Sequence, residues 1–244
     1  MEIANVYEDA ERAAAYAKLE FPGTYYLAYR DLPAIIREHI KGCRGVDFGC
    51  GTGRSTRFLR GLGLKPVGVD IAANMLKKAR ELDAAGDYRL IEDGDLSACE
   101  ASAYDLVLSV FTFDNIPTMR RKVKILEELR KLLNQEGRIV NLVSSPEIYT
   151  HEWASFTTKD FPENAAARSG DRVRIVMTDV EDRRPVEDIL WSDEDYHEAF
   201  RLAGLEVVTT HKPLGKPDEA CSWVSEASTA PWVIYVLKAA ELSA

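Results

Sequence analysis

The stretch Val46-Asp47-Phe48-Gly49-Cys50-Gly51-Thr52-Gly53 decides the fold, because it joins a strand-like apolar run to a helical pattern through three glycines at alternate positions. Glycine has no Cβ, so this loop can turn tightly and let its backbone approach a ligand. A helix that begins after Gly53 points its free N–H groups and the positive end of its dipole toward the same place. The loop therefore predicts a site for a nucleotide-like ligand.

The spacing of the glycines discriminates between ligands. A dinucleotide fingerprint, GxGxxG, would need a glycine at position 54 or 56, where the sequence has Arg54 and Thr56. The phosphate-binding pattern GxxxxGK[ST] is also missing from this loop. Asp47 instead places a carboxylate just before the glycines, which suits a ligand that carries an amine.

Two further acids follow the next two strand-like runs. Asp70 ends KPVGVD (65–70), where a carboxylate can accept hydrogen bonds from both hydroxyls of a ribose. Asp95 lies in EDGDL (92–96) and could accept from the exocyclic amine of adenine, while Leu96 offers an apolar face to the ring. The carboxyl ends of successive parallel strands meet at one edge of a sheet, where such folds bind ligands. We therefore expect one ligand that contains adenosine and bears an amine.

Along the chain around the glycine-rich loop, strand-like runs alternate with helical patterns. The strand-like runs are 45–49, 65–70, 88–92, 104–110, 138–145, 205–211 and 231–239, and the main helical patterns between them are 54–64, 72–83 and 117–133. This alternation predicts an α/β fold with a seven-stranded sheet and helices on both faces. Two more runs, 172–180 and 185–191, predict an antiparallel arm laid over the sheet.

We expect one domain over residues 1–244, with four parts. These are an N-terminal helical cap (1–41), a ligand-binding core (42–145), the inserted arm or lid (146–191) and a closing helix with the last two strands (192–244). Asp31 and Ser192 are expected to cap helices. The helix over 117–133 carries an apolar stripe, and its basic side, which includes Lys122, is interpreted as a solvated face.

The composition of the chain argues against several kinds of partner. The 244 residues include 31 Lys and Arg against 40 Asp and Glu, a net charge of −9, which argues against a nucleic-acid partner. No apolar run approaches the ~20 residues of a membrane span, and the charged N-terminal segment is not a secretion signal. We expect a cytoplasmic protein with no membrane partner.

The four cysteines and four histidines lack metal-ligand spacing, so no metal is expected. Nothing in the sequence specifies an oligomeric state.

The motifs VDFGCGTGRSTRFL, VGVDIAANML, EDGDL and YDLVLSVFTFDNIP closely resemble the successive motifs of class I S-adenosylmethionine-dependent methyltransferases. The resemblance covers about residues 40–145 and the last two strands. It implies a Rossmann-like sheet of order 3-2-1-4-5-7-6, with strand 7 antiparallel, and S-adenosylmethionine as cofactor. The cofactor-binding residues that it implies are Asp47, Gly49, Cys50, Gly51 and Gly53 around the methionine part, Asp70 at the ribose, Ile71, Asp95 and Leu96 at the adenine, Ser109 and Phe111 under the sulfonium, and Tyr25, or else Tyr16, near the carboxylate.

Methyl transfer is an in-line displacement, so the protein has mainly to align the acceptor and exclude water. A general base helps where the acceptor must lose a proton. Asp114, in the loop after the fourth strand, could orient or deprotonate an amine, or could cap the following helix. His151, in the arm near Tyr149, Trp153 and Phe156, could act as a base near neutral pH, or this aromatic group could only pack the arm down.

The sequence thus favours an enzyme that transfers a methyl group to nitrogen or oxygen of a small-molecule acceptor. One alternative is a non-catalytic S-adenosylmethionine-binding protein that regulates or scaffolds a partner. The other is a nicotinamide oxidoreductase, which Arg54 and Thr56 oppose. The loop after the fourth strand also lacks the [DN]PP[YF] signature of amino methylation on nucleic-acid bases. No motif specifies the acceptor.

Overall fold

The computed structural model describes residues 23–241. The helix expected near the N-terminus, with Tyr16, lies outside the described residues. The elements are α2 (Thr24–Arg30), α3 (Leu32–His39), β1 (Arg44–Phe48), α4 (Arg54–Gly61), β2 (Lys65–Asp70), α5 (Ala73–Leu82), β3 (Asp87–Leu90), β4 (Tyr104–Val110), η2 (Thr112–Asn115), α6 (Met119–Leu132), β5 (Leu133–Ser144), η3 (Pro146–Tyr149), β6 (Phe156–Thr157), η4 (Pro162–Ala166), β7 (Arg172–Met177), β8 (Val186–Ile189), α7 (Asp193–Leu202), β9 (Leu205–His211) and β10 (Trp232–Ala239).

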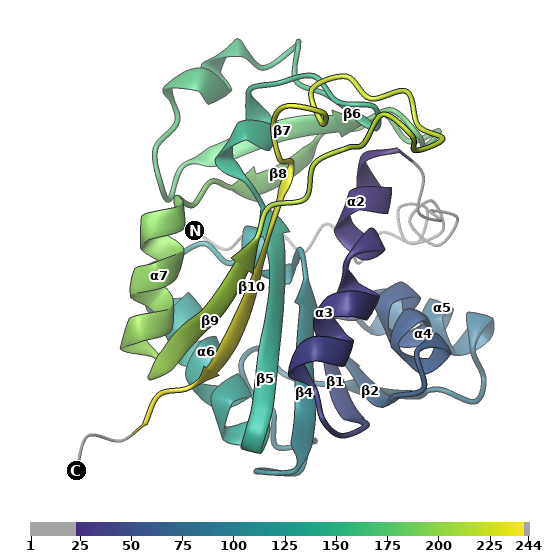
Figure 1. Ribbon diagram of the computed structural model, residues 1–244, viewed down its shortest axis with the longest axis vertical. Coiled ribbons are helices and arrows are strands. Elements are labelled where there is room, and N and C mark those ends of the chain that lie inside the picture. Colours follow the sequence, from purple (N-terminus) through teal and green to yellow (C-terminus); the bar gives the residue numbers. More distant parts are fainter. Residues whose placement is uncertain (1–22, 242–244) are drawn as a thin grey trace.

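The seven-stranded sheet has the expected order, β3-β2-β1-β4-β5-β10-β9 (Figure 1). Strands β1 to β5 pair in parallel, and β10 lies antiparallel to both β5 and β9. When the strands of this sheet are counted along the chain, β9 is the sixth and β10 the seventh, so the order 3-2-1-4-5-7-6 with an antiparallel seventh strand is confirmed. The parallel strands bring their carboxyl ends to one edge of the sheet.

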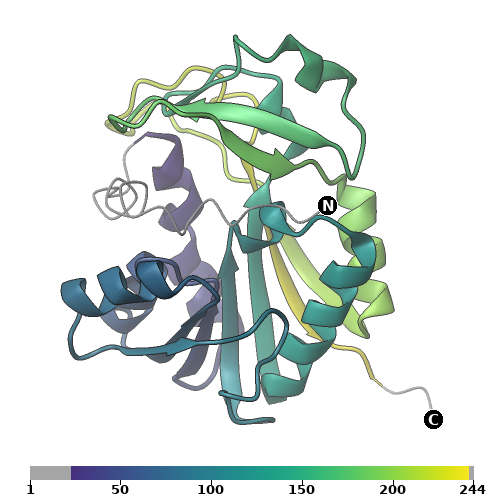
Figure 2. The same ribbon diagram turned by 180° about the vertical axis from the view of Figure 1, so that it is seen from behind.

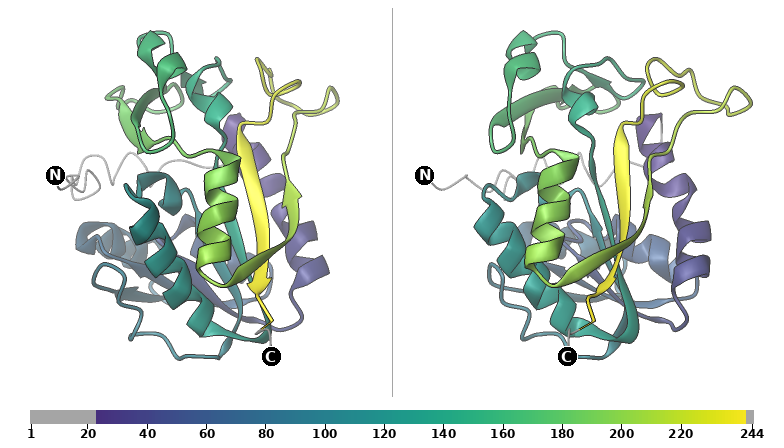
Figure 3. Two further views of the ribbon diagram at one scale, coloured as in Figure 1. Left: turned by 90° about the vertical axis from the view of Figure 1, so that its left-hand side faces the viewer. Right: turned by 60° about the vertical axis from the view of Figure 1, so that its left-hand side comes forward.

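Helices cover both faces of the sheet. Figure 3 shows α6 and α7 on one side and α2 and α3 on the other. Each side has its own buried apolar cluster, in which α6 and α7 contribute Leu126 and Phe200 to one and α3 contributes Ile35 to the other. None of the helices within residues 23–241 has the length and apolar content needed to cross a bilayer.

The inserted arm forms a small antiparallel sheet in the order β6-β7-β8. Sequence patterns predicted β7 and β8 but not β6, which is only two residues long. Figures 1 and 2 show this sheet above the carboxyl edge of the main sheet. The arm therefore lies over the edge where the expected ligand site is found.

Two local expectations were wrong. Asp31 precedes α3, but its side chain makes no capping hydrogen bond and pairs with Arg30 at 2.8 Å instead. Lys122, expected on a solvated face of α6, is fully buried. Its long side chain reaches past the edge of the helix to donate to the backbone carbonyl of Phe113. Ser192, in contrast, caps α7 as expected, because its hydroxyl accepts from the backbone N–H of Asp195.

Candidate functional site

The glycine turn joins β1 to α4 through three residues in the left-handed region, with φ of +72° at Gly49, +53° at Gly51 and +78° at Gly53. A Cβ added at Gly49 would lie 2.1 Å from the hydroxyl oxygen of Thr112, so the side chain of η2 packs directly on the turn. At Gly51 an added Cβ would meet only the methyl group of Met75, at 3.6 Å. The middle glycine therefore leaves room beside the turn.

Asp47 is fully buried next to this turn. Its Oδ2 accepts hydrogen bonds from Ser55 Oγ at 2.7 Å and Thr56 Oγ1 at 2.6 Å. Its Oδ1 has no hydrogen-bond partner among the described residues. Burial raises the pKa of this carboxyl group to about 6. A buried oxygen without a donor is rare in folded proteins, so this atom fits a ligand N–H group, such as the amine of S-adenosylmethionine.

Asp70, at the end of β2, shapes the turn as well as facing the expected site. Its Oδ2 accepts from the backbone N–H of Gly51 at 2.7 Å, and its Oδ1 accepts from that of Ala72 at 2.8 Å. Burial raises the pKa of this carboxyl group. Each carboxylate oxygen keeps a second lone pair that can accept from a hydroxyl. Ile71, next to it, is 46% exposed, as a residue that packs on a ligand ring would be before binding.

The residues expected at the adenine edge and under the sulfonium differ in their exposure. Asp95 is exposed, and the backbone N–H of Ser97 donates to it at 2.8 Å, which lowers its pKa. Leu96 differs from the expectation that it offers a face to the ring, because its side chain is only 5% exposed and packs in the apolar core. Ser109 is fully buried on β4, and its Oγ has no partner within the described part of the chain.

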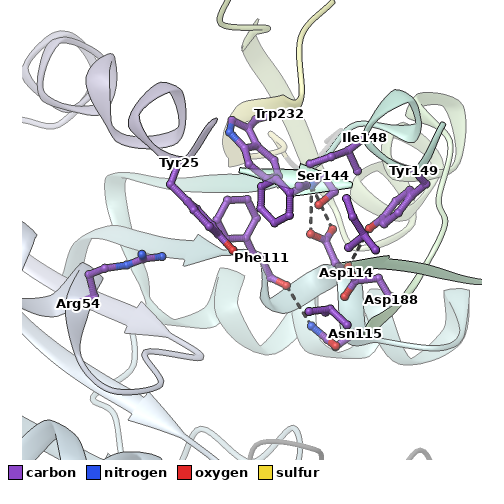
Figure 4. A pocket seen from close by; sticks show the side chains of 13 residues that line it. Tyr25, Arg54, Phe111, Asp114, Asn115, Ser144, Ile148, Tyr149, Asp188 and Trp232 are labelled. Atoms are coloured by element: carbon purple, nitrogen blue, oxygen red, sulfur yellow. Dashed lines mark hydrogen bonds between the residues drawn. The ribbon is translucent and has the colours of Figure 1, made fainter. Parts of the chain in front are cut away.

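A cavity of about 80 Å³ lies at the carboxyl edge, between the main sheet and the arm (Figure 4). It is lined by Tyr25, Arg54, Phe111, Asp114, Asn115, Ser144, Ile148, Tyr149, Phe156, Ile175, Val186, Asp188 and Trp232. Figure 4 shows Arg54 and Tyr25 at one end and Asp114 and Asp188 at the other. The cavity thus connects the neighbourhood of the glycine turn with a buried acidic end.

Aromatic rings form much of the wall. The ring of Tyr25 lies 5.9 Å from those of both Phe111 and Trp232, and the Phe111 and Trp232 rings are 4.6 Å apart. The guanidinium of Arg54 lies over Tyr25 and Tyr29, at 5.1 and 5.3 Å from the ring centroids. Sequence reasoning missed Arg54 as a site residue. Its position directly after the glycine turn was the available signal, but that position does not specify where a long side chain points.

Asp114 is buried at the other end of the cavity, where it accepts from the backbone N–H of Ser144 at 3.1 Å and from the Tyr196 hydroxyl at 3.3 Å. It does not cap α6, since the hydroxyl of Thr118 accepts from the helix N-terminus instead. Burial raises the pKa of Asp114 to about 6 and lowers that of the nearby Lys122 to about 7. The capping role weighed for Asp114 is therefore wrong, and its role toward an acceptor stays a prediction.

His151 is exposed and is not among the residues that line the cavity. Its Nδ1 lies 3.1 Å from both the Thr150 hydroxyl and the Glu147 carbonyl. A base must reach the acceptor directly or through one water molecule. Asp114 therefore lines the cavity and His151 does not, and the role of either as a base stays a prediction.

A family model described as a methyltransferase domain matches residues 46–139. Among solved structures, the CcbJ methyltransferase from Streptomyces caelestis has the same fold with a TM-score of 0.69 at 20% identity, covering 98% of this chain and 100% of that one. An S-adenosylmethionine-dependent methyltransferase from Clostridium acetobutylicum matches with a TM-score of 0.63 at 14% identity, covering 98% of both chains. Residues 46–139 therefore match a methyltransferase domain, and the chain shares the fold of these methyltransferases. The matching domain and the shared fold imply S-adenosylmethionine as the cofactor of this domain.

Curated relatives of this chain include ubiquinone biosynthesis O-methyltransferases. That of Burkholderia thailandensis is 33% identical over 84 residues, which are 33% of this chain and 36% of the relative. That of Xanthomonas oryzae is 27% identical over 107 residues, which are 42% of this chain and 44% of the relative. The chain therefore matches less than half the length of these relatives.

Proposed function

We propose that this chain transfers a methyl group from S-adenosylmethionine to nitrogen or oxygen of a small-molecule acceptor. The observation that carries the proposal is the buried Oδ1 of Asp47, which lacks a hydrogen-bond donor beside a turn where Gly51 leaves open room. When bound, the cofactor supplies a methyl carbon that its sulfonium has already activated. The remaining chemistry is alignment and exclusion of water, which side chains of this site can provide.

Each part of the cofactor has a candidate partner. The proposed contacts are Asp47 with the amine, Arg54 and Tyr25 with the carboxylate, Asp70 with the ribose hydroxyls, Ile71 and Asp95 with the adenine, and Phe111 near the methyl group. Arg54 is suited to the carboxylate, because a guanidinium matches its geometry and because it lies on the same side of the cavity as the glycine turn. Asp47 and Arg54 together would then bind the two charges of one amino-acid group.

A small acceptor is favoured by the size and position of the cavity. It measures about 80 Å³, is walled by aromatic and aliphatic side chains and lies under the arm. The net charge of −9 opposes a nucleic-acid acceptor. The curated relatives are named as O-methyltransferases of ubiquinone biosynthesis, which supports small-molecule chemistry as the class.

Calorimetric titration with S-adenosylhomocysteine tests the cofactor site. We expect Asp70→Ala to weaken binding by about 10-fold or more, because hydrogen bonds to a charged acceptor contribute about 1.5–3 kcal/mol each. Asp87→Ala, which removes an exposed acid at the start of β3, is the matched control and should bind normally. Unchanged affinity in Asp70→Ala would refute the ribose assignment.

Incubation with an isotopically labelled methyl donor and a metabolite extract tests the reaction. A labelled small molecule, formed together with S-adenosylhomocysteine, is the expected product. If the protein binds the cofactor but labels nothing in any extract, the non-catalytic alternative replaces the enzyme proposal.

A further inference from the structure

Phe111, which follows β4, adopts a backbone conformation that is rare for a residue with a large side chain. Its φ of +60° and ψ of 0° lie in the left-handed region, and among residues 23–241 Ser102 is the only other non-glycine residue with a positive φ. In this region the Cβ atom comes too close to the following carbonyl oxygen. Such a conformation persists only where the surrounding structure holds it, and such residues cluster at functional sites.

Hydrogen bonds hold the backbone of Phe111 on both sides. Its N–H donates to the carbonyl of Leu142 on β5 at 2.9 Å. Its carbonyl accepts from the backbone N–H of Asp114 and from Nδ2 of Asn115, each at 3.3 Å. Because the N–H and the carbonyl are both bonded, the direction of the Cα–Cβ bond between them is fixed. Asn115 itself lines the cavity, so the side chain that holds the Phe111 carbonyl is part of the same wall.

Thr112 connects the residues after Phe111 to the glycine turn. Its hydroxyl donates to the Phe48 carbonyl at the end of β1 at 3.0 Å. The same hydroxyl oxygen lies 2.1 Å from the position of a Cβ added at Gly49, so this close approach requires glycine there. The start of η2 therefore has a fixed position relative to the turn beside which we propose that the cofactor binds.

The ring of Phe111 lies in the middle of the cavity wall. Its centroid is 4.6 Å from that of Trp232 and 5.9 Å from that of Tyr25. Figure 4 shows the ring between Arg54 at one end of the cavity and Asp114 at the other. Because the proposed cofactor site lies toward the Arg54 end, this ring stands where the methyl group and the acceptor would meet.

We propose that Asn115 and Thr112 are positioning residues, which hold the left-handed backbone at Phe111 so that its ring aligns the acceptor with the methyl group of the cofactor. This inference rests on the proposed function and names residues that set its alignment. An in-line displacement needs the reacting atoms close together and correctly oriented, so a displaced wall lowers the rate of transfer more than the affinity for the cofactor. The proposal thus has two separate consequences, one for stability at Phe111 and one for the rate.

The first test compares Phe111→Gly with Phe111→Ala. Both variants remove the ring, but only glycine adopts a left-handed backbone without a steric cost. We expect the unfolding equilibrium constant of Phe111→Gly to be about 3-fold or more below that of Phe111→Ala, as measured with urea. At Lys124, an exposed position within α6, the order of the glycine and alanine variants should be reversed, because glycine is the poorer helix former. A Phe111→Ala variant that is as stable as Phe111→Gly would overturn the proposal.

The second test measures the initial rate at which labelled product forms. Asn115→Ala should lower this rate by about 10-fold or more, with unchanged affinity for S-adenosylhomocysteine. Thr112→Val, which keeps the shape of the side chain against Gly49 but loses the hydroxyl, should lower the rate as well. Asn134→Ala is the matched control and should keep the wild-type rate, because Asn134 donates to Asp105 near the amino end of β5, away from the cavity.

The two ways of failing are distinguishable. A wild-type rate in Asn115→Ala and Thr112→Val variants that fold and bind S-adenosylhomocysteine would overturn this inference alone. A wild-type protein that binds S-adenosylhomocysteine but labels nothing would instead overturn the proposed function, and this inference with it.

Discussion

The hydroxyl group of Thr24 donates a 2.6 Å hydrogen bond to the carboxylate of Glu226, which lies 202 residues further along the chain. Glu226 is fully buried, and the same carboxylate accepts from the backbone N–H groups of Ala154 and Val224, each at 2.8 Å. The start of α2, the arm and the segment between β9 and β10 therefore meet at one carboxylate. Two of these segments, α2 and the arm, also contribute side chains to the wall of the cavity, among them Tyr25 and Phe156.

Glu226→Gln should lower the free energy of unfolding by about 1–3 kcal/mol, because it removes the charge from a buried acceptor of three hydrogen bonds. Urea unfolding measures the difference. Glu128→Gln is the control, since Glu128 makes a surface ion pair with Lys131, and it should stay within about 0.5 kcal/mol of wild type. Equal stability of Glu226→Gln and wild type would contradict a structural role for this carboxylate.

Binding of S-adenosylhomocysteine should weaken as the pH falls through about 6, the pKa to which burial raises Asp47. The ammonium group of the ligand needs the ionised carboxylate, and one unit below this pKa only about a tenth of the carboxylate is ionised, which predicts a roughly 10-fold loss of affinity. Calorimetry at a series of pH values measures it. In Asp47→Asn the affinity should be lower throughout and should no longer follow this titration. A wild-type affinity that is constant across this range would exclude Asp47 as the partner of the amine.

Lys122→Met should lose stability relative to wild type as the pH rises. The Lys122 ammonium lowers the pKa of Asp114, so without it that pKa rises further. An acid whose pKa is higher in the folded than in the unfolded protein stabilises the fold at low pH. This stabilisation is lost as the pH rises through the folded-state pKa, so a higher pKa of Asp114 in the variant means a larger loss. Lys122 itself adds to the same difference in stability. Because burial lowers its pKa to about 7, wild type no longer has to bury an ammonium group above that pH and becomes more stable.

The stability deficit of Lys122→Met should therefore be larger at about pH 8 than at about pH 5, by at least ~1 kcal/mol, the scale of one pKa unit. Urea unfolding at both pH values tests it. Lys124→Met, on the exposed side of the same helix, should show no such difference. A deficit that does not depend on pH would mean that Lys122 contributes only packing.

Arg54→Met should weaken binding of S-adenosylhomocysteine by about 10-fold, since charge-assisted hydrogen bonds to a carboxylate contribute about 1.5–3 kcal/mol. Methionine keeps much of the length of the side chain over Tyr25 and Tyr29 but removes the charge. Arg60→Met is the matched control on α4, because Arg60 pairs with Asp83 on the surface. Should both variants bind equally well, the carboxylate of the cofactor is held elsewhere.

The sheet and the glycine turn could be predicted from the sequence, because their signals are local. Asp47 and Asp70 lie at or near the ends of two apolar runs that predict strands. In a parallel sheet the carboxyl ends of neighbouring strands lie at one edge, so the two residues can be placed together from the sequence. The acidic end of the cavity could not be predicted in this way. Lys122 has the helical position of a surface residue, and only the packing of Trp191 and Tyr196 from another part of the chain makes it a buried one. Leu96 was misplaced for the same reason, because a loop position does not reveal which way a side chain packs.

The arm supplies nearly half of the residues that line the cavity, namely Ile148, Tyr149, Phe156, Ile175, Val186 and Asp188. None of them belongs to the glycine turn or to the strands that carry Asp47 and Asp70. If the proposed function holds, changes within one continuous stretch of the gene could therefore alter the acceptor, while the glycine turn and the strands that carry Asp47 and Asp70 stay unchanged.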